Sequence, residues 1–523
     1  TMDRSGLMVS SAYGSAATGS ITIDATTVSM GTGAAIESST FGSGDAGNIV
    51  VRATGDIAIS NARIASEAEI GSSGNAGAIE IDAARLAVFN GGEIAVSTFG
   101  SGDAGLIDIS APQIGLDQGR IASEAEVGST GDAGAVIVSG TLLRLTRDSI
   151  ITSSGFGPGT AGAVGVEVAT LTLDDSAITS AASGTGDGGD IAVRAGLVTL
   201  TNGSTIATST LGPGIGGDVA VDATTVALSQ GSMISSDLLG GGAGFAGTVT
   251  VRATTLTVAS QAEISSATVG TGDAGIVTVA ARNITLDGGL INTSTYGTGA
   301  AGLVDLDADT LTIINDGSIV SATTASGAAG VIDVRAKTIR LGSLGLIQST
   351  TSASGNAGNI LINATDIRLD PTGRILSSQA NAQATGNAGS ISITTGTLFA
   401  APASKAAIST SIFSTGTAGE IGITARSITL DGAEIASAAN GTVSGTSGSI
   451  AIVADTLNLI NGGSIETSSL SPGPAGAISI DAAQLIVQGT ASRIASENRS
   501  QRGGPAGSID VESADLRLLD GGS

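Results

Sequence analysis

Oxygen-bearing side chains suited to metal binding recur at one position of the sequence, two residues before a glycine. They are Asp45, Asn75, Asp103, Asp132, Asp187, Asp273, Asn356 and Asn387. Stacked on one another, they would offer calcium the oxygen ligands that it takes in sets of six to eight. The dense Gly-Asp pattern of calcium-loaded β-rolls is absent, however, and Thr417 and Pro474 hold the same position elsewhere. We therefore expect these side chains to form turns and expect no cofactor, with calcium at the acidic residues as the alternative.

Hydroxyl side chains form a second series, two positions after an isoleucine in seventeen successive segments, and sixteen of the seventeen are Ser or Thr. The series is Ser38, Ser66, Val96, Ser123, Thr152, Ser180, Thr208, Ser236, Ser266, Thr293, Ser321, Ser349, Ser377, Thr410, Ser437, Thr467 and Ser496. A serine nucleophile usually needs a histidine base, and the chain has no His. Ordering of water, as in ice-binding proteins, is another alternative. We expect a structural ladder in which each buried hydroxyl bonds the identical residue of the next segment.

Other weak signals for chemistry are explained more simply by structure. Asp174 and Asp175 are the clearest adjacent carboxylates, but they follow the strand-like "LTL", so we expect a solvated turn rather than an acid–base pair. The string "GGGAGFAG" at 240–247 resembles a phosphate loop, yet no Lys-Ser or Lys-Thr follows it. The sequence thus predicts no catalytic, cofactor-binding or metal-binding residue, and the protein is not expected to be an enzyme.

The elements that position these residues form a repeat. The phrase "STFGSGDAG" occurs at 39–47 and again at 97–105, and its last glycine starts the pattern Gly-x-aliphatic-x-aliphatic. Eighteen such anchor glycines are spaced 27–31 residues apart. They are Gly19, Gly47, Gly77, Gly105, Gly134, Gly162, Gly189, Gly217, Gly247, Gly275, Gly302, Gly330, Gly358, Gly389, Gly419, Gly448, Gly476 and Gly507. A fixed period of this length is typical of a solenoid.

Each repeat contains three short alternating segments, which indicate strands with one face buried. In the repeat that begins at Gly247, the aliphatic residues are Val249 and Val251, then Leu256 and Val258, then Ile264. The predicted fold is all-β: a right-handed parallel β-helix with three short strands per rung and about 17–18 rungs of 27–31 residues. A rung is one coil of this solenoid. We expect residues 1–523 to form a single continuous array, and we attribute the glycine-rich corners to positive φ angles.

Six of the nine aromatic residues share one phase of the repeat, six residues before an anchor glycine: Tyr13, Phe41, Phe99, Phe156, Tyr296 and Phe413. We expect them to cap the core at the corner. The alternative is a stripe that binds a ligand or makes lateral filament contacts, because aromatic residues are enriched at interfaces.

Composition limits the partners. The formal net charge is −25, with 21 basic residues in 523, so no nucleic acid is expected, because phosphate neutralisation needs clustered Lys and Arg. No apolar run reaches the roughly 18 residues that span a bilayer. The chain contains no Cys, which excludes disulfides and thiol chemistry and is compatible with any compartment.

The repeats resemble a known family. Units such as "GDAGNIVVRATGDIAISNARIAS" and "AGTVTVRATTLTVASQAEISS" are similar to the haemagglutinin-type repeats of filamentous-haemagglutinin-like exoproteins of Gram-negative bacteria, cyanobacteria included. The resemblance covers the whole chain. It implies a β-helical fibre exported by two-partner secretion through an outer-membrane transporter, located extracellularly or at the cell surface, with roles in adhesion, aggregation or biofilm. The family's amino-terminal secretion domain and its Asn-Pro-Asn motifs are not in this sequence.

The sequence therefore favours a non-enzymatic extracellular structural or adhesive fibre segment. Its expected partners are glycans or proteins of host or neighbouring cells, or copies of itself. One alternative is a self-assembling surface filament or sheath subunit. The disfavoured alternative is a carbohydrate-active β-helix lyase or hydrolase, which would need long loops between rungs. Both ends interrupt the repeat, so we expect a segment cut from a longer fibre.

Overall fold

The structure is a computed structural model that describes residues 1–2, 5–241, 243–402, 407–441, 443–501 and 503–523. Every regular element in these residues is a β-strand, and neighbouring strands pair in parallel, as β7 does with β9. The predicted fold class is confirmed: the protein is a parallel β-solenoid of about 18 rungs. None of the described segments is a helix long and apolar enough to cross a membrane.

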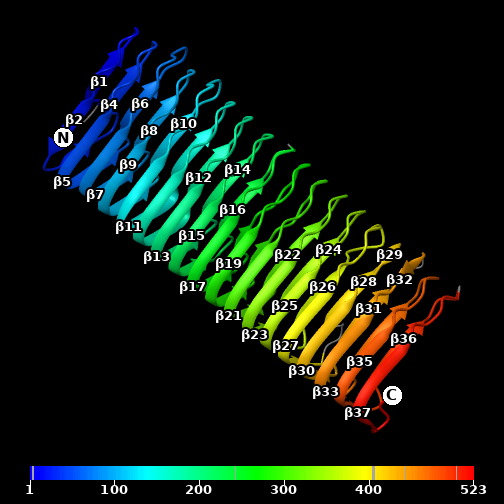
Figure 1. The fold of residues 1–523 in the computed structure, drawn as a ribbon. Helices are drawn as coiled ribbons and strands as arrows, with labels where there is room; N and C mark the ends of the chain where they lie inside the picture. The colour runs from blue at the N-terminus through cyan, green and yellow to red at the C-terminus, as the bar shows by residue number, and fades with distance from the viewer. Residues whose placement is uncertain (3–4, 242, 403–406, 442, 502) are drawn as a thin grey trace. The chain divides into compact units, whose positions relative to one another are not determined.

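The contacts divide the chain into two compact units, and each is a stack of rungs. The first unit comprises Thr1–Thr254 and Ala262–Ser266, and the second comprises Thr255–Gln261 and Ala267–Ser523. The prediction of one continuous array stays a prediction. Figure 1 shows the strands of each unit following one another in chain order.

The first unit holds β1 (Leu7–Ala12), β2 (Ile21–Ala25), β3 (Val28–Met30), β4 (Ala35–Thr40), β5 (Ile49–Ser60), β6 (Arg63–Ala68), β7 (Ile79–Phe89), β8 (Glu93–Thr98), β9 (Ile107–Asp117), β10 (Arg120–Ala125), β11 (Val136–Gly155), β12 (Val164–Ala182), β13 (Ile191–Thr201), β14 (Thr205–Thr210), β15 (Val219–Leu228), β16 (Met233–Leu238), the first part of β17 (Val249–Ala259) and β18 (Glu263–Ser265).

The second unit holds the rest of β17 and β19 (Val277–Asp287), β20 (Leu290–Asn292), β21 (Val304–Ile314), β22 (Ser318–Thr323), β23 (Ile332–Leu341), β24 (Leu346–Thr351), β25 (Ile360–Leu369), β26 (Arg374–Gln379), β27 (Ile391–Ala400), β28 (Ile408–Ile412), β29 (Gly416–Thr417), β30 (Ile421–Asp431), β31 (Glu434–Ala439), β32 (Gly445–Thr446), β33 (Ile450–Ile460), β34 (Ser464–Ser469), β35 (Ile478–Gln488), β36 (Arg493–Asn498) and β37 (Ile509–Leu519).

A typical rung consists of a long strand, a short strand and a glycine-rich arc. The first two predicted segments form one continuous strand. In β7 the side chains of Ile79 and Ile81 are buried and, after two consecutive exposed residues reset the alternation, so are those of Leu86 and Val88. The third predicted segment is the short strand, such as β8. Aliphatic residues at these positions pair in register from rung to rung, as Ile79 does with Ile107, and together fill the core.

The anchor glycines are needed for close stacking, and our attribution of them to positive φ is wrong. No described anchor glycine has a positive φ. Instead, a Cβ on Gly134 would lie 2.1 Å from the carbonyl oxygen of Gly105, the anchor of the preceding rung. A Cβ on Gly105 would likewise lie 2.3 Å from the carbonyl oxygen of Gly77. The arcs are packed backbone against backbone, so a side chain directed at the preceding arc has no room.

Positive φ angles occur mainly at a different corner, between the long and short strands. Asn90 (φ 53°) and Gly91 (φ 78°) connect β7 to β8, and Asn202 (φ 55°) and Gly203 (φ 73°) connect β13 to β14. Asparagine tolerates the left-handed region better than most residues because its side chain bonds locally.

Replacing an anchor glycine should destabilise the protein. We expect Gly134→Ala to lower the free energy of unfolding by about 1–3 kcal/mol, because the stacked carbonyl leaves no space for a methyl group. The matched control is Gly165→Ala in β12, where a Cβ meets nothing within 4 Å; we expect a change within about 0.5 kcal/mol. Urea unfolding followed by circular dichroism compares the two. Equal stability of the two variants would contradict the stacking explanation.

Candidate interaction surface

The hydroxyl series lies on the inward face of the short strands and stacks in register from rung to rung. Ser38 pairs with Ser66, and Ser321 pairs with Ser349 and then Ser377. One assignment was wrong: Ser123 pairs with Ser153, not with Thr152. Ser153 is completely buried. Ile151, rather than Ile150, occupies the core position in that rung.

The partners of these hydroxyls differ from the expected ones, because most hydroxyls bond the anchor glycines rather than one another. Ser153 Oγ accepts a hydrogen bond from the backbone N–H of Gly162 (2.8 Å) and donates one to the carbonyl oxygen of Gly134 (2.8 Å). Ser123 bridges Gly134 and Gly105 in the same way. Among the described hydrogen bonds of the series, one fits the expected hydroxyl ladder: the Thr410 hydroxyl donates to the Ser437 hydroxyl (3.0 Å).

The corner Asp and Asn side chains also bond from rung to rung. We expected each of them to bond within its own turn, and that expectation is wrong, because the donor is a backbone N–H of the next rung. Asp45 accepts from the backbone N–H of Asn75 (2.8 Å), Asn75 from that of Asp103 (2.8 Å), and Asp103 from that of Asp132 (2.9 Å). In the second unit, Asp273 accepts from the N–H of Ala300 (2.7 Å). Across the described ranges, no group of three or more acidic residues is placed to share a metal ion. Calcium at this corner stays a hypothesis.

Asp174 and Asp175 do not converge as an acid–base pair. Asp174 Oδ1 accepts a hydrogen bond from the Asn202 side chain of the next rung (2.6 Å). Asp175 has a positive φ (50°) and is exposed, but both residues lie within strand β12 rather than in a separate turn. Part of the string at 240–247, residue 242, lies outside the described residues.

The corner aromatics do not cap the core; that prediction is wrong. The side chains of Tyr13, Phe41, Phe156, Tyr296 and Phe413 are exposed, and that of Phe99 is half-buried. Strand alternation explains the error. Ile36, Ser38 and Thr40 point inward along β4, so the next residue, Phe41, points outward.

In the first unit these aromatics belong to a longer series, with one apolar side chain at this corner of each of six successive rungs. This series, called here the apolar column, consists of Tyr13, Phe41, Ile70, Phe99, Val127 and Phe156. Ile70 is 83% exposed and Val127 is 80% exposed. The rings of Tyr13 and Phe41 stack, with centroids 4.6 Å apart. Sequence reasoning missed Ile70 and Val127, although both lie in the repeated phrase that begins "IASEAE".

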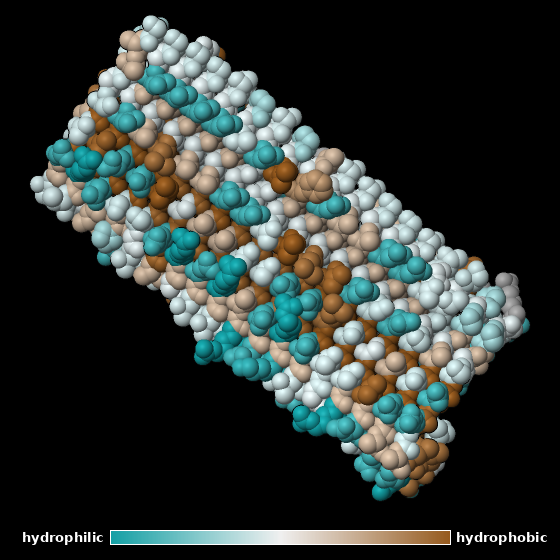
Figure 2. All heavy atoms as spheres, in the orientation of Figure 1, coloured by the Kyte–Doolittle hydropathy of each residue, from teal (hydrophilic) through white to brown (hydrophobic). Residues whose placement is uncertain are grey.

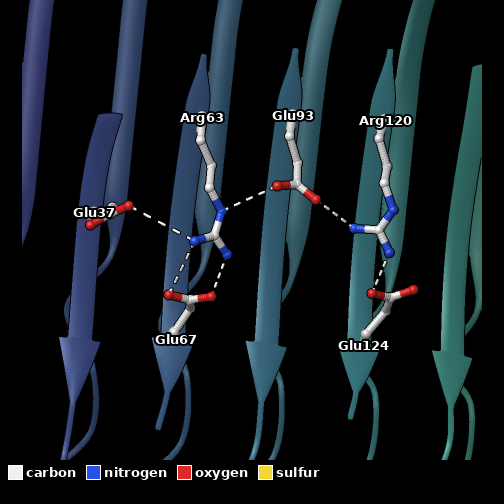
Figure 3. Close-up of polar contacts among 6 residues, drawn as sticks. All are labelled: Glu37, Arg63, Glu67, Glu93, Arg120 and Glu124. Atoms are coloured by element: carbon white, nitrogen blue, oxygen red, sulfur yellow. Dashed lines mark hydrogen bonds and ion pairs between the residues drawn. The ribbon is translucent and has the colours of Figure 1, made fainter. Parts of the chain in front are cut away.

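Charged side chains on the outer face of the neighbouring short strands form an ion-pair ladder of Glu37, Arg63, Glu67, Glu93, Arg120 and Glu124 (Figure 3). Arg63 contacts Glu67 on its own strand, Glu93 on β8 (3.2 Å) and Glu37 on β4 (3.8 Å). Arg120 contacts Glu93 (2.7 Å) and Glu124. Figure 2 shows a row of hydrophilic side chains over β4, β6, β8 and β10.

Two further acids connect the ladder to the apolar column. Glu69 and Glu126 occupy the corner position just before Ile70 and Val127. Burial raises the pKa of each carboxyl, and the neighbouring carboxylates, Glu67 for Glu69 and Glu124 for Glu126, raise it further. The ladder together with Glu69 and Glu126 contains six Glu and two Arg. This part of the surface is therefore acidic, and the apolar column lies beside it.

The hydroxyl series supplies a stability prediction. Ser153→Ala leaves the Gly162 N–H and the Gly134 carbonyl without this partner, so we expect the free energy of unfolding to fall by about 1–3 kcal/mol. Ser110→Ala, on the exposed outer face of β9, is the control and should change it by no more than about 0.5 kcal/mol. Chemical denaturation measures both. A Ser153→Ala protein as stable as its control would show that these bonds contribute nothing.

Glu126 supplies a pH prediction. Because its folded-state pKa is raised, the folded protein binds more protons than the unfolded chain between the ordinary carboxyl range and that raised value. Stability therefore falls as the pH rises through this window, and the charged carboxylate destabilises the fold above it. We expect Glu126→Gln to be more stable than the wild type at neutral pH, with the difference lost below the ordinary pKa.

Thermal melting over a pH series tests this expectation, with exposed Glu167→Gln as the control that keeps the wild-type pH profile. A Glu126→Gln profile parallel to that of the wild type would exclude a raised pKa at this position.

Comparisons with protein-family models, curated proteins and solved structures found no match for this chain.

Proposed function

We propose that this chain is a segment of a non-enzymatic extracellular fibre, located at or shed from the cell surface, that adheres through the apolar column and the acidic ladder beside it. The observation that supports the proposal best is one apolar side chain at this corner of each of six successive rungs, five of them exposed and Phe99 half-buried. Single exposed apolar side chains are common on soluble proteins, but contiguous exposed apolar surface is a mark of interaction sites.

The scaffold suits a role in contact rather than in chemistry. Parallel pairing fixes each rung about 4.8 Å from the next, so Phe41, Phe99 and Phe156 lie at one register position along one edge. Ile70 and Val127 lie one residue beyond that position, next to Glu69 and Glu126. A partner with an extended shape gains apolar contact at each rung, at roughly 25 cal/mol per Å² buried. The acids beside the column bias the partner toward neutral or basic groups and against polyanions.

The proposed partners are surface proteins or glycans of host or neighbouring cells, with an outer-membrane transporter needed for export. This part of the proposal rests on the resemblance of the repeats to filamentous-haemagglutinin-like exoproteins. Lateral association of copies through the same column is the alternative, and it would make the chain a filament or sheath subunit.

Removal of the column tests the adhesive function. We expect the triple variant Ile70→Ser, Val127→Ser and Phe156→Ser to bind intact epithelial or Gram-negative cells about tenfold more weakly than the wild type, because three of the six apolar side chains of the column are removed. The control replaces Ile137, Ile276 and Leu361 with Ser; these are exposed apolar residues outside the column. Flow cytometry of labelled protein measures binding.

Unchanged binding of the column variant, at unchanged melting temperature, would exclude the column as the adhesive surface. Column-dependent self-association in sedimentation, without cell binding, would favour the filament alternative instead.

A further inference from the structure

A groove of about 460 Å³ lies on the outer face of β7, β9 and β11 in the first unit. Its lining includes Arg85, Ala87, Phe89, Gly115 and Arg144. These residues come from the second half of each long strand, whereas the apolar column follows the short strands. The groove is therefore separate from the surface proposed above, and the inference drawn from it does not depend on the adhesive function.

Register explains why the groove is open. Ala87 pairs with Gly115, and Gly115 pairs with Arg144, so two small residues separate the arginine of β11 from the outer face of β7. A Cβ placed on Gly115 would meet no atom within 4 Å. Arg85 lies on β7, two residues before Ala87, and Phe89 lies two residues after it. The result is a shallow floor with a guanidinium on either side and an aromatic ring at one end.

The two arginines have no carboxylate partner within the part of the chain that the structure describes. No ion pair within 4.0 Å involves Arg85 or Arg144, although Asp56 pairs in register with Arg85 on β5. Asp117 also lines the groove, but its carboxylate is bound by Arg147. That hydrogen bond lowers the pKa of Asp117 and keeps it charged. Two arginines without an ion pair within 4.0 Å thus face one groove, and the charge of Arg144 contributes to the lowered pKa of Asp117 beside it.

The spacing of the cations selects the ligand. Arg85 and Arg144 are on strands two rungs apart, about 10 Å at the usual strand separation. One small anion cannot reach both, whereas a chain with repeated carboxylates can. A guanidinium forms paired hydrogen bonds with a carboxylate. The ring of Phe89 and the methyl group of Ala87 offer apolar contact for a sugar ring between the charges.

We propose that this groove binds an acidic oligosaccharide, with carboxylates of two of its uronic acid residues held by Arg85 and Arg144. Nucleic acid fits less well, because its phosphates are usually neutralised by a larger cluster of Lys and Arg than the two arginines that line this groove.

The test is calorimetric titration of the full chain with a tetrasaccharide of galacturonic acid. We expect saturable binding that weakens as salt is added. Arg85→Gln and Arg144→Gln should each lower the affinity about tenfold, the usual effect of losing a charge-assisted hydrogen bond. The matched control is Arg194→Gln, an exposed arginine of β13 that also lacks an ion pair, which should bind as the wild type does. Circular dichroism establishes that the variants are folded.

Three results would overturn the proposal. They are no binding by the wild type, equal binding of the methyl-esterified tetrasaccharide, and an equal loss of affinity in Arg194→Gln. Tighter binding of a short DNA duplex than of the tetrasaccharide would also overturn it. None of these results would bear on the cell-binding test of the apolar column, whose residues lie elsewhere.

Discussion

The close approach of successive glycine-rich arcs is the constraint on which the rest of this structure depends. Sixteen of the eighteen anchor glycines lie directly over the carbonyl group of the preceding anchor, at a distance that leaves no room for a side chain. Because the arcs touch through their backbones, every rung has nearly the same rise, and residues at one phase of the repeat fall into straight columns. The aliphatic core, the buried hydroxyls and the exposed column are all consequences of this single spacing.

The same arcs raise a hydrogen-bonding problem, which side chains solve. Most of each arc lies outside the strands, and although some of its amides bond the next rung, as Ala46 N–H does with the Asn75 carbonyl (2.8 Å), the regular ladder of a sheet is interrupted there. Buried backbone groups left without partners would destabilise the fold. Serine hydroxyls on the inner side bridge two successive anchors, and Asp or Asn on the outer side receives the amide of the next rung. In the sequence, the columns of hydroxyl residues and of Asp or Asn resemble catalytic or metal sites. The structure explains them by the hydrogen bonds that they form with backbone groups of the arcs.

With the interior fixed in this way, variation is left to the outward positions. Alternate short strands place Arg63 and Arg120 between glutamates, so charges are neutralised across rungs as well as along one strand. Where this neutralisation is incomplete, as at Glu126 and at Arg85, the surface keeps an electrostatic bias that a partner can use. The proposed cell contact and the proposed saccharide groove are two such places on one scaffold.

The period of the sequence by itself determined the all-β solenoid, the columns of buried aliphatics and the phase of the hydroxyl series, because a regular repeat leaves few ways to bury the same positions in every rung. It did not determine which way a residue faces where alternation is ambiguous. The adjacent Ile150 and Ile151 allowed two registers, and only the pairing with β10 selected Ser153. Likewise, the alternation of inward and outward side chains along β4 directs Phe41 outward. The anchor positions require glycine because the carbonyl groups of the preceding rung leave no room for a Cβ, and not because of a positive φ angle. The register and the stacking depend on the neighbouring rung, about 28 residues away, so no local pattern contains them, whereas the direction of Phe41 follows from the local alternation of β4.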